Sequence, residues 1–163
     1  MQHVPPQGYA SQGGAAPAQA PKVLAQAAEV DAAPQRRLRV YIIEDNAIIC
    51  ESLVATLEEL APVEVVGTAA EEWTAVQWLS QAANGCDLAI VDIFLRSGSG
   101  LGVLRSLDSA RPGYPIVVLS NYATADIRRK CLELGADAVF DKSNDIDALL
   151  AYCRRLAGAA AGS

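Results

Sequence analysis

Short apolar runs alternate along the chain with longer segments in which apolar residues recur every three or four positions. The short runs are rich in β-branched residues and are typical of buried strands, whereas the recurring spacing is typical of helices that bury one face. Strands that alternate with helices predict a parallel sheet. The predicted strands are 40–43, 63–69, 87–91, 115–119 and 139–140, and the predicted helices are 47–60, 71–83, 101–109, 123–134 and 145–156.

The predicted helices carry signals for their ends and for their buried faces. Asn46 is placed to cap the first helix, and Gly135 is placed to end the fourth. The residues expected to face the core are Ile49, Leu53, Leu57 and Leu60 in the first helix, Trp73, Val76 and Leu79 in the second, and Ile146, Leu149, Leu150, Cys153 and Leu156 in the last.

The first 37 residues differ in composition from the rest of the chain. They are dominated by Ala, Gln, Pro and Gly, and they have few large apolar side chains whose burial could offset the entropy lost on ordering. We therefore expect a disordered Ala/Pro/Gln-rich tail over residues 1–37, one folded domain over 38–157 and a flexible C-terminus over 158–163.

Charge and composition exclude several classes of function. The chain carries a net charge of −6, and direct binding of nucleic acid is not expected because it depends on clustered Lys and Arg. No apolar run approaches membrane-spanning length and no signal peptide is recognised, so we expect a cytoplasmic protein without a membrane partner. The four cysteines lack the paired spacing of metal ligands and are expected to be free thiols: Cys50, Cys86, Cys131 and Cys153.

Polar residues stand at the downstream ends of four predicted strands. The carboxyl ends of parallel strands share one edge of a sheet, where ligands bind at the topological switch point. Three carboxylates, one hydroxyl and one ammonium would meet at that edge. They are Glu44 and Asp45 after the first strand, Asp92 after the third, Ser120 after the fourth and Lys142 after the fifth.

These five residues are suited to hold a divalent cation and a phosphoryl group. Mg²⁺ prefers oxygen ligands and is often held by one or two carboxylates, for which Asp45 and Asp92 are the candidates, with Glu44 acting through a coordinated water. Crowded carboxylates repel one another, and one of them can attack phosphorus. Lys142 and Ser120 would stabilise the charge on the oxygens of the transferred group.

With these residues in place, the segment from about 39 to 156 resembles the receiver domain of two-component response regulators. Two further matches support the resemblance: Gly100 stands eight residues after Asp92, and the run Gly135-Ala136-Asp137-Ala138 leads to Lys142. The resemblance implies an α/β flavodoxin-like (βα)5 three-layer sandwich with a five-stranded parallel sheet of order 2-1-3-4-5.

The resemblance also implies roles for individual residues. Asp92 would accept a phosphoryl group from a histidine kinase or a histidine phosphotransfer protein. Mg²⁺ would be bound by Asp45, Asp92 and the backbone carbonyl of Phe94, while Glu44 assists through water. The hydroxyl and the ammonium would contact the phosphoryl group. The protein would thus be a phosphoacceptor that supports its own phosphoryl transfer rather than a dedicated enzyme.

Several positions near the site depart from the pattern that is common in the family. Arg96 and Ser143 stand where proline is frequent. Val139 stands where an aromatic residue that reports activation is common, and Asn121 stands where Ala or Gly is usual. Phe140 is adjacent to Val139 but should point to the opposite face of its strand.

Two aromatic residues stand where side chains of the family flank the path of attacking water. Phe94 and Tyr122 lie two residues beyond Asp92 and Ser120. Bulky rings there could exclude water from an acyl phosphate, so we hypothesise slow self-dephosphorylation. The alternative is that both rings merely pack.

Two other functions remain open for the same residues. A Mg²⁺-dependent phosphatase with an Asp nucleophile would require a second Asp where Phe94 stands, which makes it the weaker alternative. A protein-binding module of the same fold that works without phosphorylation is the other.

The only histidine, His3, lies in the tail, so the phosphodonor histidine must belong to another protein. No DNA-binding or catalytic module follows the last helix, so we expect signalling through an unidentified downstream protein partner. Formation of a homodimer is a further possibility that the sequence leaves open.

Overall fold

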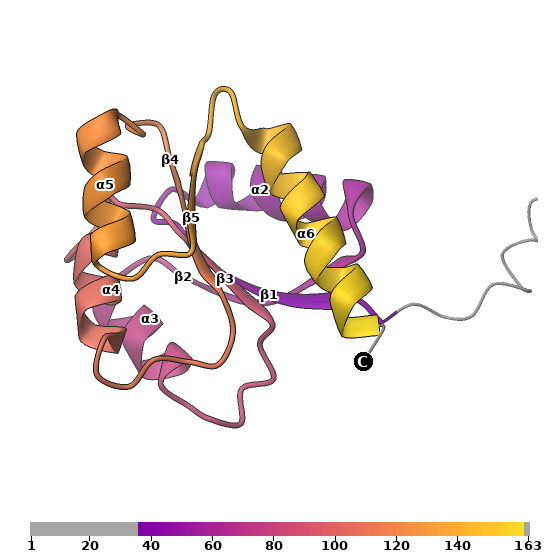
Figure 1. Ribbon diagram of the computed structural model, residues 1–163, viewed down its shortest axis with the longest axis horizontal. Coiled ribbons are helices and arrows are strands. Elements are labelled where there is room, and N and C mark those ends of the chain that lie inside the picture. The colour runs from indigo at the N-terminus through magenta and orange to yellow at the C-terminus, as the bar shows by residue number, and fades with distance from the viewer. Residues whose placement is uncertain (1–35, 162–163) are drawn as a thin grey trace, which may run out of the picture. The chain divides into compact units, whose positions relative to one another are not determined.

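Five parallel strands form one sheet with helices on both faces, in a computed structural model that describes residues 36–161 (Figure 1). The strand order is β2-β1-β3-β4-β5, which confirms the predicted flavodoxin-like α/β fold. In chain order the elements are β1 (Leu38–Ile43), α2 (Ala47–Leu60), β2 (Val63–Ala69), α3 (Glu72–Leu79), β3 (Leu88–Val91), α4 (Gly100–Leu107), β4 (Ile116–Ser120), α5 (Ala125–Glu133), β5 (Ala138–Asp141) and α6 (Ile146–Ala161). Residues 1–35, which include His3 and most of the predicted tail, lie outside the described residues.

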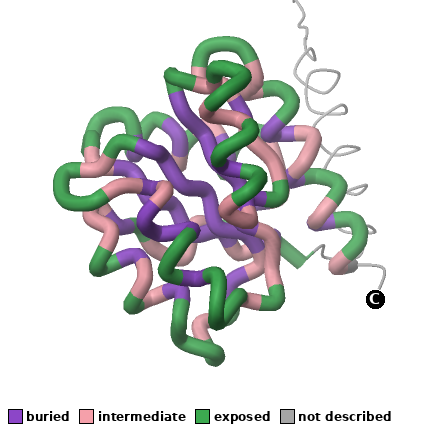
Figure 2. Tube along the Cα trace, turned by 60° about the vertical axis from the view of Figure 1, so that its left-hand side comes forward, coloured by how far each residue is buried: buried purple, intermediate pink, exposed green. Residues whose placement is uncertain are grey.

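The core consists of two apolar layers, one on each face of the sheet. Alternate residues of β1 belong to different layers: Val40 and Ile42 pack with α2 and α6, whereas Tyr41 and Ile43 pack with α3, α4 and α5. Every residue of β3 and β4 is buried, because strands covered on both faces present no side chain to solvent. Figure 2 shows buried residues gathered at the centre, with exposed residues on the outer sides of helices and in loops.

The buried face of α2 differs from the predicted one. Asn46 caps the helix as expected, since its side chain accepts a hydrogen bond from the amide of Ile49. However, Ile49 and Leu60 are 37% and 50% exposed, and the helix instead buries Cys50 together with Leu53 and Leu57. Leu53 and Leu57 belong to two neighbouring apolar stripes of the helix, one of which includes Ile49 and the other Cys50. The sheet contacts the stripe that includes Cys50.

The predicted core role of Trp73 in α3 is also wrong. This ring is 71% exposed, and Ala75 and Leu79 form the buried face. Trp78 is the aromatic residue that packs inward, where it stacks on Tyr41 with ring centroids 3.9 Å apart. The helix ends at Leu79 rather than at residue 83, and the carbonyl of Leu79 accepts a hydrogen bond from the hydroxyl of Tyr114.

At the other end of the chain, α6 continues to Ala161, so the last helix extends beyond the predicted range of 145–156. Alanine is the strongest helix former and dominates this stretch, which explains the extension. The four cysteines are buried free thiols, as predicted. Within residues 36–161, we find no helix with the length and apolarity needed to cross a bilayer.

Candidate functional site

The ends of β1, β3, β4 and β5 bring the predicted site residues together at one edge of the sheet. Register pairs Ile43 of β1 with Val91 of β3, and the amide of Asp92 donates to the carbonyl of Ile43 over 2.9 Å. On the other side, the amide of Lys142 donates to the carbonyl of Ser120 over 3.0 Å. These backbone contacts place residues from distant parts of the sequence side by side.

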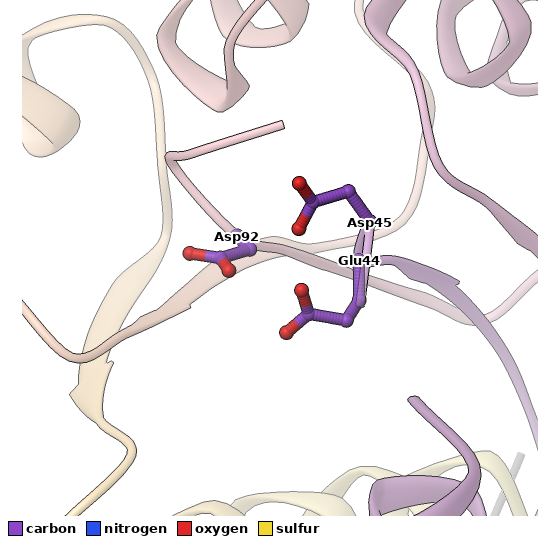
Figure 3. Close-up of side chains that lie close together, drawn as sticks. All are labelled: Glu44, Asp45 and Asp92. Atoms are coloured by element: carbon purple, nitrogen blue, oxygen red, sulfur yellow. The ribbon is translucent and has the colours of Figure 1, made fainter. Parts of the chain in front are cut away.

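Three carboxylates form the centre of the site. Ligand oxygens of Glu44, Asp45 and Asp92 all lie within 4.8 Å of one another. Figure 3 shows the side chains of Glu44 and Asp45 extending from the end of β1 toward the side on which Asp92 lies. Glu44 and Asp92 are buried, with 5% and 8% of their surface exposed, whereas Asp45 is half-buried.

Lys142 supplies a positive charge to this cluster. Its Nζ donates to Oδ2 of Asp92 over 2.9 Å and also to Oε1 of Glu44. Burial by itself lowers the pKa of the Lys142 ammonium, but the hydrogen bonds and charges of Glu44 and Asp92 outweigh burial and raise this pKa above its ordinary value of 10.5. Lys142 is therefore charged at neutral pH.

One ammonium does not balance three carboxylates, so the cluster keeps excess negative charge. Buried charge of this kind is stabilised by a bound cation. Mg²⁺ prefers carboxylate and carbonyl oxygens and retains several waters. The donor atoms of Glu44, Asp45 and Asp92 thus fit Mg²⁺, and the half-buried position of Asp45 leaves one side of the cluster open to solvent.

Hydrogen bonds from the backbone fix the orientation of the side chains that surround the cation position. Oδ1 of Asp92 accepts from the amide of Ile93 over 2.7 Å, and Oε2 of Glu44 accepts from the amide of Asn46 over 3.2 Å. The hydroxyl oxygen of Ser120 accepts from the amide of Tyr122 over 3.2 Å, and Ser120 is completely buried. Ser120 therefore holds its own turn while it lines the site.

A cleft of about 490 Å³ contains all six of the predicted site residues, Glu44, Asp45, Asp92, Phe94, Ser120 and Lys142. Asn46 and Ile49 also line the cleft, although neither is among the predicted site residues. Asn46 directly follows Asp45, and Ile49 lies in the first turn of α2. This short separation from the two carboxylates is the signal that places both residues near the site.

Phe94 and Tyr122 form an aromatic pair in the wall of the cleft. Their rings meet edge to face, with centroids 5.0 Å apart and an interplanar angle of 72°. Both rings keep contact with solvent, since the residues are 55% and 60% exposed. The pair joins the loop after β3 to the loop after β4. The two rings thus contact each other beside Asp92.

Strand β5 carries the position where the family pattern favours an aromatic residue. Val139 packs in the layer of α3, α4 and α5, while Phe140 packs in the layer of α2 and α6, where its ring meets Tyr152. The prediction that Phe140 points to the opposite face is confirmed. Its ring therefore cannot replace an aromatic side chain at position 139.

The loop between β3 and α4 folds back on itself beside Asp92. The amide of Gly100 donates to the carbonyl of Ile93 over 2.8 Å, and Phe94 pairs with Ser99 in an antiparallel bridge. A Cβ atom at Gly100 would lie 2.2 Å from the carbonyl oxygen of Asp92, so glycine is required for this close approach. The closed loop determines where the backbone of Phe94 lies.

Comparisons with known proteins support the resemblance to receiver domains. A model of the response regulator receiver domain family matches residues 40–154. A protein-glutamate methylesterase/protein-glutamine glutaminase of Anaeromyxobacter dehalogenans is 34% identical over 109 residues, which are 66% of this chain and 29% of that protein. A probable transcriptional regulatory protein of Picosynechococcus is 33% identical over 132 residues, which are 78% of this chain and 52% of that protein.

Solved structures show the same fold. A CheY-like response regulator receiver domain protein from Methanospirillum hungatei superposes with a TM-score of 0.63 at 25% identity, covering 78% of this chain and 99% of that one. By contrast, the matched segment spans only 29% and 52% of the two curated relatives. The methylesterase and transcriptional activities in their names are properties of those whole proteins.

Proposed function

This chain belongs to the response regulator receiver domain family, and we propose that Asp92 accepts a phosphoryl group from the phosphohistidine of a histidine kinase or histidine phosphotransfer protein. The observation that carries the proposal is the setting of Asp92. Its carboxylate is held by Lys142 and by the amide of Ile93, within 4.8 Å of two further carboxylates. An oriented nucleophile beside a cation position is what phosphoryl transfer requires of a protein.

The transfer step follows from these positions. A carboxylate oxygen of Asp92 forms a bond to phosphorus while the P–N bond of the donor breaks, and the electron pair of that bond stays on the imidazole nitrogen. Asp45, Asp92 and the carbonyl of Phe94 would hold Mg²⁺, with Glu44 acting through water. When bound, Mg²⁺ would neutralise charge on the phosphoryl oxygens.

Lys142 and Ser120 would stabilise the same oxygens from the other side. An ammonium has three N–H donors, of which Lys142 gives two to Glu44 and Asp92, so the third can be donated to the phosphoryl group. The hydroxyl of Ser120 accepts from the amide of Tyr122, which leaves its own proton to donate. Both groups would then pair with the aspartyl phosphate after transfer.

We further propose that the phosphorylated domain signals through contacts with another protein. The excess of acidic residues does not favour a nucleic acid partner. Four reduced, buried thiols fit a cytoplasmic location, where disulfides are rare. The chain would act as a phosphoacceptor rather than as a turnover enzyme. Recovering proteins from a lysate with phosphorylated and unphosphorylated chain would identify the downstream partner.

Intact mass spectrometry after incubation with Mg²⁺ and a small phosphodonor such as phosphoramidate tests the proposal. We expect a gain of one phosphoryl group that is lost on chelation of Mg²⁺ and in Asp92→Asn. A matched control is Asp126→Asn, which removes a carboxylate from a side chain that is 86% exposed on α5 and should leave the gain intact. Absence of the gain in the parent chain would contradict the proposal and favour a phosphorylation-independent binding module. Continuous release of phosphate from ester substrates would favour a phosphatase.

A further inference from the structure

We propose that Glu72, at the start of α3, is a positioning residue that keeps the β3–α4 loop in the shape that the metal site needs. The proposal rests on the proposed function, because it concerns the loop that carries the backbone carbonyl of Phe94. Glu72 lies on α3, outside this loop, and would act on the metal only through the position of the loop.

Glu72 holds the far end of this loop by two hydrogen bonds. Its Oε2 accepts from the amide of Ser99 over 2.9 Å, and its own amide donates to the carbonyl of Ser97 over 3.0 Å. Residues 27 positions apart in sequence are thereby joined. Ser99 in turn caps α4, because its hydroxyl accepts from the amide of Gly102.

Glycine makes room for this carboxylate. A Cβ atom at Gly102 would lie 2.3 Å from Oε2 and 2.4 Å from Oε1 of Glu72, and the three nearest atoms to it all belong to the Glu72 carboxylate. The carboxylate also lies at the N-terminus of α4, where the helix dipole favours negative charge. The side chain of Glu72 is therefore seated in a space that the sequence keeps open.

From Ser99 the contact continues to the proposed metal ligand. Ser99 faces Phe94 across the antiparallel bridge, and the neighbouring bond from Gly100 to Ile93 closes the loop beside Asp92. A shift of Ser99 would therefore move the backbone of Phe94. Groups that orient metal ligands typically change metal affinity by about 10–100-fold when they are removed.

Titration calorimetry of the full chain with Mg²⁺ tests this role. Glu72→Ala removes the acceptor for the Ser99 amide, and we expect Mg²⁺ to bind roughly tenfold more weakly, the lower end of the range for groups that orient ligands, because only one ligand is affected. Glu72→Gln keeps an acceptor oxygen without the charge and should bind Mg²⁺ within about twofold of the parent if the hydrogen bond is what matters.

Gly102→Ala is a second, independent variant. It would displace the Glu72 carboxylate while introducing the better helix former, and we expect it to weaken Mg²⁺ binding as Glu72→Ala does. Combining Gly102→Ala with Glu72→Ala should cause no further loss of Mg²⁺ affinity, since both substitutions remove the same contact. The matched control is Glu71→Ala, which removes a neighbouring carboxylate whose side chain makes no capping hydrogen bond, and it should leave Mg²⁺ affinity unchanged.

Urea unfolding of the metal-free variants separates positioning from a merely structural role, since positioning predicts weaker Mg²⁺ binding in variants that remain fully folded. Asp45→Asn serves as a test of the metal site itself. If Asp45→Asn abolishes binding while Glu72→Ala and Gly102→Ala bind as the parent does, the positioning role is wrong and the metal site stands. If the parent chain binds no Mg²⁺, both proposals are wrong.

Discussion

Replacing Phe94 and Tyr122 together by serine is predicted to shorten the lifetime of the phosphoryl group on Asp92. The two rings contact each other edge to face in the cleft wall, with centroids 5.0 Å apart. Water that attacks the acyl phosphate would have to pass beside this pair or separate it. Removal of both rings would open that path and would leave the carboxylate cluster in place.

The expected magnitude follows from the energy of the ring contact. Edge-to-face aromatic pairs contribute about 0.5–1.5 kcal/mol beyond their buried area, and about 1.4 kcal/mol in an activation barrier corresponds to a factor of ten in rate. Because the two residues are 55% and 60% exposed, the energy of their contact lies below the upper limit of this range. Dephosphorylation should therefore accelerate by about two- to tenfold in the double variant.

The assay follows intact mass with time after the phosphodonor has been removed. Single variants are informative, because a shield that depends on the pair should lose most of its effect when either ring is removed. Leu132→Ser, at an apolar residue with a similar exposure of 52% on α5, is the control. An unchanged lifetime in the double variant, or an equal change in the control, would refute the shielding argument and leave the rings with a packing role alone.

Three further predictions concern charge and stability. Because the pKa of Lys142 is raised above 10.5 in the folded protein, its contribution to folding should hold from neutral pH to 10.5 and be lost as pH rises through the folded pKa. Urea unfolding of the parent and of Lys142→Met across this range checks it, and a stability difference that shrinks below 10.5 contradicts it. Asp92→Asn should leave the metal-free protein about as stable as the parent but remove its stabilisation by Mg²⁺, which in the parent is about 1.4 kcal/mol at tenfold excess over the dissociation constant; thermal unfolding with and without Mg²⁺ measures both. Arg128→Leu should lower the free energy of unfolding by about 1–3 kcal/mol, because its guanidinium donates to two backbone carbonyls and to Asp145; an unchanged urea midpoint would show that water replaces these bonds without loss.

The sheet edge could be predicted from sequence because topology, rather than detailed packing, determines it. The alternation of strands and helices places the strand ends along one edge of a parallel sheet, and the strand order that the receiver-domain resemblance implies places β1 beside β3. The pairing of Ile43 with Val91 then brings Glu44 beside Asp92. Apolar runs identify these strands and polar residues follow them directly. The six site residues predicted from the sequence are accordingly among the ten residues that line the cleft.

Contacts that depend on helix rotation could not be predicted in the same way. In α2, Leu53 and Leu57 fit two stripes equally well, and only the sheet determines that Cys50 is buried while Ile49 is exposed. The hydrogen bond from the amide of Ser99 to the carboxylate of Glu72 joins the start of α4 to the start of α3. A glutamate in the first turn of a helix gives no sign in the sequence that it binds the backbone of another element. These features depend on packing between elements.

Peptide mass spectrometry of the phosphorylated chain tests the central claim most directly. Borohydride reduces an aspartyl phosphate to homoserine, so the modified residue is marked permanently before digestion. After incubation with Mg²⁺ and phosphoramidate, the account predicts homoserine at Asp92, with Glu44, Asp45 and the other acidic residues unchanged. Homoserine at any other aspartate, or none in a chain that binds Mg²⁺, would contradict it.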